Sequence, residues 1–180
     1  MSEYVLESPS AIDLEWVVRR HSAIYAEEYG WDNRFGSLVA EVVAQYAGSK
    51  DPECERGWIA RRAGENVGCV FLVRQSKEVA QLRLLLVEPS ARGLGIGRQL
   101  IQECMNFGRR CRYRKIMLWT NDVLVAARHL YEEAGFHLVH EERHCRFGPK
   151  ITGQTWEAAL QSAIKGKDLP CVGSVGGRVQ

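Results

Sequence analysis

The stretch "VEPSARGLGIGRQLI", residues 87–101, places three glycines at alternate positions between an apolar, strand-like run and a helix-like run. Glycine lets the backbone turn sharply and lets a ligand approach the amides, because no Cβ stands in the way. The N–H groups that open the following helix, with the helix dipole behind them, suit a phosphate. Arg92 and Arg98 flank these glycines with positive charge. The pattern favours an anion site over a plain strand–turn–helix connection.

Two common nucleotide motifs do not fit this stretch. A dinucleotide fingerprint needs G-x-G-x-x-G, and Arg98 or Leu100 stands where its last glycine belongs. A P-loop ends in Gly-Lys-Ser or Gly-Lys-Thr, whereas Gly97 is followed by Arg98 and Gln99. The anion is therefore expected to belong to another kind of ligand.

Composition is that of an ordinary globular protein, with 180 residues, 46% hydrophobic and 26% charged residues, and a formal net charge of +2. No apolar run approaches the ~18 residues of a membrane span, and the first ten residues lack the features of a secretory signal. Six cysteines without a CxxC pattern indicate a reducing compartment. We therefore expect a cytoplasmic protein without a membrane partner.

Hydrophobic spacing predicts alternating helices and strands in a single domain. The tail, residues 161–180, has turn residues without periodicity, and we expect it to be disordered outside a domain of residues 1–160. The element order predicts a mixed α/β fold with helices on both faces of one sheet. Helices are expected at residues 12–28, 35–47, 95–108 and 123–135, and strands at 4–7, 57–62, 67–75, 79–89, 115–120, 136–143 and 151–160.

The glycine stretch resembles the acyl-CoA-binding motif of the GNAT N-acetyltransferase superfamily. That motif is Arg/Gln-x-x-Gly-x-Gly/Ala after a V-x-P strand end, here Val87-Glu-Pro89 followed by Arg92 to Gly97. The segment "TNDVLVAARHLYEEAGF", residues 120–136, is similar to the family's second signature, with Asn121 and Tyr131. The resemblance spans about residues 3–160 and is strongest to the acetyltransferase half of bacterial fusions with a MarR-type regulator. It implies a GNAT fold with one mixed, mostly antiparallel sheet.

The resemblance also implies which residues contact acetyl-CoA as acyl donor. Leu85 and Val87 would hold the pantetheine arm through their backbones, and an N–H of Leu85 or Leu86 would stabilise the oxyanion. Asn121 would contact the cofactor where the central strands splay, and Tyr131 would protonate the departing thiolate. The full set is Leu85, Leu86, Val87, Arg92, Gly93, Leu94, Gly95, Ile96, Gly97, Arg98, Asn121 and Tyr131.

The sequence gives weaker signals for the general base and the acceptor site than for the cofactor site. An amine nucleophile with a pKa of ~10 must lose a proton, so the reaction needs a proton acceptor. Some family members have a glutamate on the strand before the loop, whereas this strand carries Gln81 and Arg83. His21, Tyr25 and Glu28 share one helical face, which could bind the amine with Glu28 as base or electrostatic partner. A helix–helix contact with a surface glutamate is the alternative.

Other charged stretches predict no additional partner. "HEERHC", residues 140–145, reads as a strand, where side chains alternate in direction, so no metal site is predicted. The basic run "GRRCRYRKIM", residues 108–117, is explained by a solvated helix end or by the 3′-phosphate of CoA, and no nucleic-acid partner is expected. The resemblance is compatible with a homodimer.

The sequence supports two alternative functions. One is transfer of an acetyl group from acetyl-CoA to a primary amine of a small molecule or protein, by direct attack in a ternary complex. The other is a non-catalytic acyl-CoA-binding regulatory module that acts through a protein partner. The missing strand carboxylate and the kinship to a regulator-fused domain motivate the second.

Overall fold

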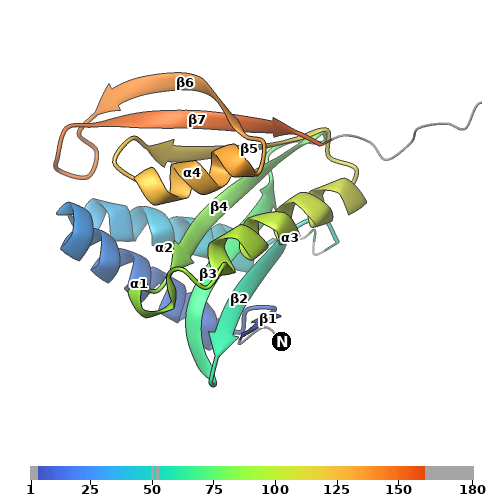
Figure 1. The fold of residues 1–180 in the computed structure, drawn as a ribbon, viewed down its shortest axis with the longest axis horizontal. Coiled ribbons are helices and arrows are strands. Elements are labelled where there is room, and N and C mark those ends of the chain that lie inside the picture. Colours follow the sequence, from blue (N-terminus) through green and yellow to red (C-terminus); the bar gives the residue numbers. More distant parts are fainter. Residues whose placement is uncertain (1–3, 50, 52, 161–180) are drawn as a thin grey trace, which may run out of the picture.

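The computed structural model describes residues 4–49, 51 and 53–160, which form a seven-stranded sheet with helices on both faces (Figure 1). The strand order is β1-β2-β3-β4-β5-β7-β6, with β4 and β5 parallel and every other neighbouring pair antiparallel. The predicted disordered tail lies outside the described residues. The strands are β1 (Val5–Glu7), β2 (Arg56–Arg62), β3 (Glu65–Arg74), β4 (Val79–Val87), β5 (Lys115–Asn121), β6 (His137–His144) and β7 (Ile151–Ala159). The helices are α1 (Ala11–Tyr29), α2 (Asn33–Ala47), the short 3-10 helix η1 (Pro89–Ala91), α3 (Ile96–Arg110) and α4 (Val125–Glu133).

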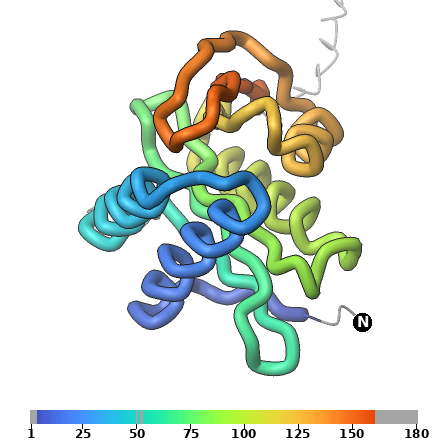
Figure 2. Tube along the Cα trace, turned by 90° about the vertical axis from the view of Figure 1, so that its left-hand side faces the viewer, coloured from blue at the N-terminus to red at the C-terminus, as the bar shows by residue number. Residues whose placement is uncertain are grey.

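Two hydrophobic cores lie on opposite faces of the sheet. Helices α1 and α2 cover one face, where Val17 and Val39 pack against Phe71 of β3. Helix α3 covers the other face, where Leu100 packs near Leu82 of β4. Figure 2 shows α1 and α2 in blue on one side of the green strands and α3 in yellow-green on the other. The predicted mixed α/β architecture is confirmed.

Helix α1 begins and ends with side-chain and backbone signals that the sequence displays. The Ser10 side chain caps its first turn, and the Ser10 N–H donates to the Asp13 carboxylate at 2.7 Å. Gly30, with φ of 67°, ends the helix in the left-handed region. The Asp13 carboxylate is 2% exposed and lies 2.9 Å from Arg61 Nη2 on β2, which ties the start of α1 to the β2–β3 hairpin.

A β-bulge interrupts β4 at its centre. The register with β3 moves from Phe71↔Arg83 to Cys69↔Leu86, so one residue of β3 faces two residues of β4. Leu84 adopts a positive φ of 55° there, which is uncommon for a residue with a Cβ. Before the bulge Leu82 faces α3, whereas after it Leu86 faces α1 and α2. Beyond the bulge, each side chain of β4 therefore faces the opposite core from the one that a regular strand would give it.

Pairing between the parallel strands stops at the same place. Strand β4 pairs with β5 from Val79↔Lys115 to Leu82↔Leu118, and the two strands have no ladder beyond this point. The C-terminal half of β4 consequently has no strand partner on its β5 side. Two pockets that share lining residues open at this divergence.

The close approach of β3 to the end of β4 generates a test of the fold. A Cβ added at Gly68 would lie 3.0 Å from the backbone oxygen of Leu86 and 3.2 Å from Ile96 Cγ2. Gly68→Val should therefore lower the free energy of unfolding by about 2 kcal/mol in urea titrations, as overpacking does. Gly48→Ala is the control, because its added Cβ meets nothing closer than 3.4 Å, and it should stay within about 0.5 kcal/mol of wild type. Equal effects would contradict this packing.

His21 is a buried polar side chain within the core under α1. Its ring is 1% exposed and stacks on Tyr25 with centroids 5.8 Å apart. Nδ1 lies 2.8 Å from the Val17 carbonyl oxygen, which can only accept, so Nδ1 carries the proton. Nε2 is buried without a hydrogen-bond partner among the described residues. Burial lowers the pKa of His21 to about 4, so the ring is neutral at physiological pH.

This burial makes stability depend on pH. The unfolded chain binds a proton at this histidine near pH 6.5, whereas the folded chain does so near pH 4. Because the unfolded state binds more protons between these values, the free energy of unfolding should fall as pH drops through this window, by about 3 kcal/mol in total.

His21→Leu should remove that component when wild type and variant are unfolded in urea at pH 7 and pH 4.5. His140→Gln, at an exposed position of β6, is the matched control variant. An unchanged pH dependence in His21→Leu would show that His21 is not the responsible group.

Candidate functional site

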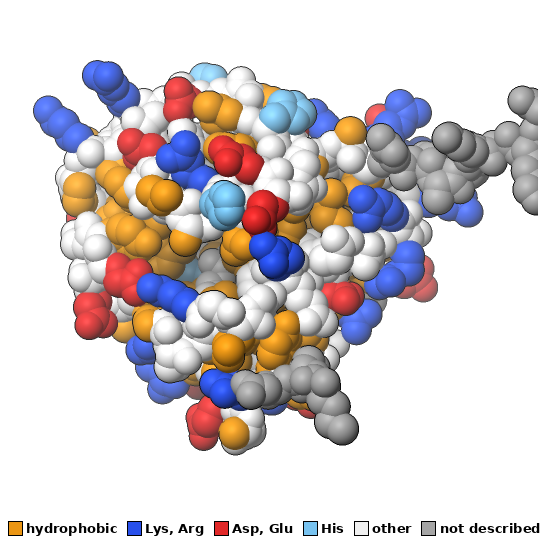
Figure 3. Space-filling view, viewed as in Figure 1, with side chains coloured by type: hydrophobic (Ala, Val, Ile, Leu, Met, Phe, Trp, Pro, Cys, Tyr) orange, Lys and Arg blue, Asp and Glu red, His pale blue; other side chains and the backbone are white. Residues whose placement is uncertain are grey.

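Two connected pockets open where β4 and β5 diverge. The loop pocket, about 460 Å³, lies among the glycine stretch, α1 and α4. The inner pocket, about 690 Å³, lies among α1, α2, the central part of β4, the end of β5 and the segment after β6. Apolar side chains gather between α1 and α4 on this face of the molecule (Figure 3). Residues that line both pockets are Tyr25, Leu85, Leu124 and Ala127.

The glycine stretch shapes the floor of the loop pocket. Gly93 and Gly95 have φ of 82° and 78°, and Gly95 caps α3 without any side-chain hydrogen bond to the helix start. The first N–H groups of α3 therefore remain available to an anion. Gly97 lets Leu130 of α4 approach, because a Cβ would lie 2.8 Å from Leu130 Cδ1. The close packing of α4 against α3 closes one side of this pocket.

Most of the predicted cofactor residues come together in the loop pocket. Leu94 does not line it and is 39% exposed. Asn121 and Tyr131 line the inner pocket instead. The residues that do line it are Leu85, Leu86, Val87, Arg92, Gly93, Gly95, Ile96, Gly97 and Arg98.

Both arginines of the glycine stretch form ion pairs with carboxylates. Arg92 Nη2 lies 2.7 Å from Glu28 Oε1 of α1, and Arg98 Nη2 lies 2.8 Å from Glu133 Oε2 of α4. The Arg98 guanidinium holds the pKa of Glu133 below its usual range. Exposed pairs of this kind contribute little stability, so an anion could recruit both guanidinium groups.

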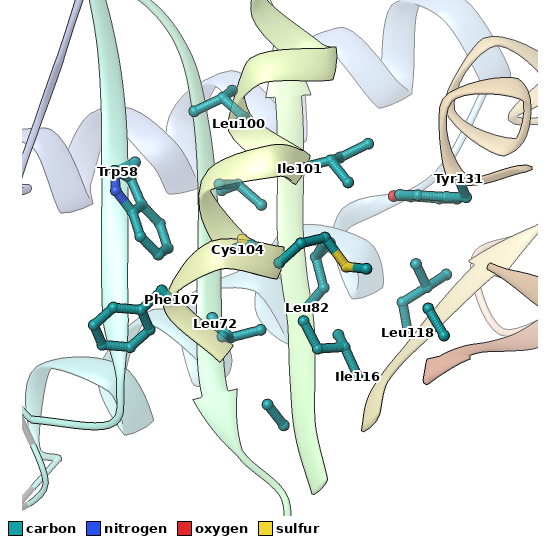
Figure 4. Close-up of a cluster of buried hydrophobic side chains, with 14 of the residues drawn as sticks. Trp58, Leu72, Leu82, Leu100, Ile101, Cys104, Phe107, Ile116, Leu118 and Tyr131 are labelled. Carbon is teal, nitrogen blue, oxygen red and sulfur yellow. The ribbon is translucent and has the colours of Figure 1, made fainter. Parts of the chain in front are cut away.

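Tyr131 extends from α4 toward the sheet and lines the inner pocket. Figure 4 shows its ring extending away from α4, with the oxygen directed inward. The side chain is 5% exposed. Burial raises the pKa of Tyr131, so the phenol is protonated at neutral pH. Tyr131 lines the inner pocket together with Leu85, which also lines the loop pocket.

Asn121 is held by His144, a contact that the sequence reasoning missed. Asn121 is 2% exposed at the end of β5, and its Oδ1 lies 2.8 Å from His144 Nε2. His144 Nδ1 accepts the Arg146 N–H at 3.2 Å, so Nε2 carries the proton and donates to Asn121. Gly153 of β7 makes room, because a Cβ there would lie 3.1 Å from the His144 ring. No local pattern signals a contact across 23 residues.

The helical face predicted for the acceptor is divided between the two pockets. His21 lines the inner pocket and Tyr25 lines both. Glu28 lines the loop pocket alone, where it pairs with Arg92. The three residues therefore do share one face of α1, as the spacing predicts, but Glu28 lies beside the glycine stretch rather than in the inner pocket.

Several residues of the inner pocket have no motif that could reveal them. Arg34 of α2 comes from the first half of the chain, and Trp119 comes from the end of β5. Arg146 and Phe147 follow β6, and long-range folding places them over the same space. Arg83 lies on β4 immediately before the bulge and also lines this pocket.

Neither a metal cluster nor a membrane helix is found in the described part of the chain. Within residues 4–49, 51 and 53–160, no three His, Cys, Asp or Glu side chains converge as metal ligands would. Over the same residues, no helix has the length and apolar character needed to cross a bilayer.

Solved structures share this architecture. An acetyltransferase from Streptococcus agalactiae superposes with a TM-score of 0.73 at 20% identity, covering 89% of this chain and 100% of that chain. The protein yncA from Salmonella typhimurium, solved with its cofactor acetyl-CoA, superposes with a TM-score of 0.70 at 14% identity, covering 93% and 100%. At these identities the likeness concerns the fold alone.

Sequence relationships extend beyond the fold. N-acetylaspartate synthetase of Xenopus tropicalis is 36% identical over 88 residues, which are 48% of this chain and 32% of that protein. The chain thus spans about a third of the length of the curated relatives it matches. The profile of the "Acetyltransferase (GNAT) family" matches residues 14–136. The chain belongs to the GNAT acetyltransferase family.

Proposed function

We propose that this protein is an N-acetyltransferase that transfers an acetyl group from acetyl-CoA to a primary amine of a small molecule or protein. The observation that carries the proposal is that two pockets meet at Leu85, just after the bulge of β4, and that Tyr131 lines the inner one. One pocket suits the thioester donor and the other suits the acceptor. The proposal includes direct attack in a ternary complex, because Leu85 lines both pockets and both substrates could meet there.

The loop pocket is the donor site in this proposal. The uncapped N-terminus of α3 and the two flanking arginines suit a pyrophosphate. Beyond the bulge, the backbone of Leu85 to Val87 has no strand partner on its β5 side and can bind an extended amide-bearing arm. The solved relative from Salmonella typhimurium binds acetyl-CoA with the same fold, which supports this assignment.

The junction of the pockets supplies the groups that acyl transfer needs. A backbone N–H of Leu85 or Leu86 can donate to the carbonyl oxygen as negative charge develops there. The Tyr131 hydroxyl can protonate the departing thiolate. The attacking amine must lose a proton, which passes to water or to a base; neutral His21 has too low a pKa, about 4, to take a proton efficiently from an ammonium group.

Tyr131→Phe tests the acid role. The variant should lower kcat by about 100-fold, because a positioned acid contributes at least that factor, while acetyl-CoA affinity stays near wild type. Thiol release with a reactive amine measures kcat, and calorimetry measures affinity. Tyr4→Phe is the matched control, since the Tyr4 hydroxyl bonds Gln99 at the exposed surface. Unchanged turnover in Tyr131→Phe would remove the acid role.

Glu28→Gln tests whether Glu28 acts on the donor side or as the general base. Its ion pair with Arg92 competes with a bound pyrophosphate, so the variant should bind acetyl-CoA more tightly, by up to about fivefold, at nearly unchanged kcat. Glu133→Gln should behave alike, because Glu133 pairs with Arg98. A large fall in kcat for Glu28→Gln alone, with a lost limb of the pH–rate profile, would support the base role instead.

A non-catalytic acyl-CoA-binding module, of the kind fused to MarR-type regulators, is the second candidate. Two observations favour it: the start of β4 carries Gln81 and Arg83 in place of a carboxylate, and Glu28 is engaged by Arg92. Release of free CoA from acetyl-CoA in the presence of an amine panel separates the candidates. Acetyl-CoA binding without CoA release across the panel would favour the module.

A further inference from the structure

Arg83 differs from the other arginines of the inner pocket in having no carboxylate partner. Arg34 pairs with Asp32 at 2.6 Å, and Arg146 pairs with Glu142 at 3.0 Å. Among the described residues, the Arg83 guanidinium reaches only the side-chain oxygen of Gln81, at a long 3.3 Å. A guanidinium carries five donors, so most of its hydrogen-bonding capacity is unused.

The environment of Arg83 makes this unpaired charge costly. The side chain is partly buried at the edge of the pocket, and burial lowers its pKa, with no neighbouring carboxylate raising it. The group remains charged at physiological pH because an arginine titrates far above it. A partly desolvated cation without a counter-ion is destabilising unless a ligand provides one.

The alternation of side chains before the bulge determines which face Arg83 occupies. Ala80 and Leu82 of β4 face the α3 core, so Arg83, which alternates with them, faces the inner pocket on the α1 and α2 side. Leu85, two residues further on, lies at the junction with the loop pocket. The cation therefore lies within one short ligand's reach of the proposed reaction centre.

We propose that the acceptor amine carries a carboxylate close to its amino group, as an amino acid does, and that Arg83 binds this carboxylate. The inference rests on the proposed function, since it names the acceptor class of the same site. A planar guanidinium and a carboxylate match in a bidentate pair, which fixes the direction of the neighbouring amine.

The opposite choice would be a polycationic acceptor held by acidic side chains. Glu41 and Glu142 also line the inner pocket, but Glu142 is already paired with Arg146. Once the Arg34–Asp32 and Arg146–Glu142 pairs are set aside, the charged residues left in the lining are Arg83, which is partly buried, and Glu41, which is exposed. The less solvated of these two charges is positive, and this disfavours a polyamine. Spermidine is accordingly the competing arm of the test.

Matched acceptors provide the experiment. Each of several L-amino acids is compared with its amide and with its decarboxylated amine, alongside spermidine, by CoA release from acetyl-CoA. Wild type should show kcat/KM about 10- to 100-fold higher for amino acids than for their amides, as a charge-assisted pair predicts. Arg83→Gln should abolish that ratio by lowering kcat/KM for amino acids alone, and Arg83→Lys should restore part of it.

Arg114→Gln is the matched control, because Arg114 is an exposed cation that pairs with Glu78 and lines neither pocket. It should keep the wild-type ratio. If the wild-type protein acetylates the amides, the decarboxylated amines or spermidine as efficiently as the amino acids, the inference is overturned, although acetyl transfer itself is retained. An equal loss for every acceptor in Arg83→Gln would overturn it as well.

A failure of acetyl transfer itself is distinguishable. If no amine causes release of CoA, calorimetry with CoA-saturated protein can still measure whether the same amino acids bind at Arg83. Amino-acid binding that the amides lack and that Arg83→Gln loses, with CoA affinity unchanged, supports the inference. Absence of that difference overturns it.

Discussion

The site depends on one constraint, the bulge of β4 at Leu84. An extra residue in one strand reverses the alternation of side chains and increases the local twist. In this protein the bulge coincides with the last paired residues of β4 and β5, Leu82 and Leu118. The two central strands separate there, and the backbone that loses its partner lines both pockets. A regular strand would have continued the ladder and filled this space.

The two pockets differ in whether their arginines have ion-pair partners and in how far these arginines are buried. Around the glycine stretch, Arg92 and Arg98 lie at the exposed rim and are paired with carboxylates of α1 and α4. Solvent screens such pairs, so their partners can be exchanged at little cost. In the inner pocket Arg83 is partly buried and lacks a carboxylate. The first arrangement tolerates an incoming anion, whereas the second leaves a partly buried cation without an ion-pair partner.

Much of this site was predictable because its signals are consecutive in the chain. The glycine stretch, the strand that precedes it and the Asn121–Tyr131 segment each combine local backbone needs with local chemistry. The placement of these residues was less accessible. Asn121 and Tyr131 line the inner pocket rather than the loop pocket, and Leu94 lines neither, because strand divergence and helix rotation decide which cavity a side chain enters.

The amino-acid sequence by itself determined the order of helices and strands, the turn that opens α3 and the family of the chain, since periodicity, capping and glycine placement act over a few residues. Tertiary structure alone decided that His144 orients Asn121, that Arg92 engages Glu28 and that Arg83 stays unpaired. These contacts join segments brought together by sheet pairing and helix packing. Their energies depend on burial and distance, which no local pattern encodes.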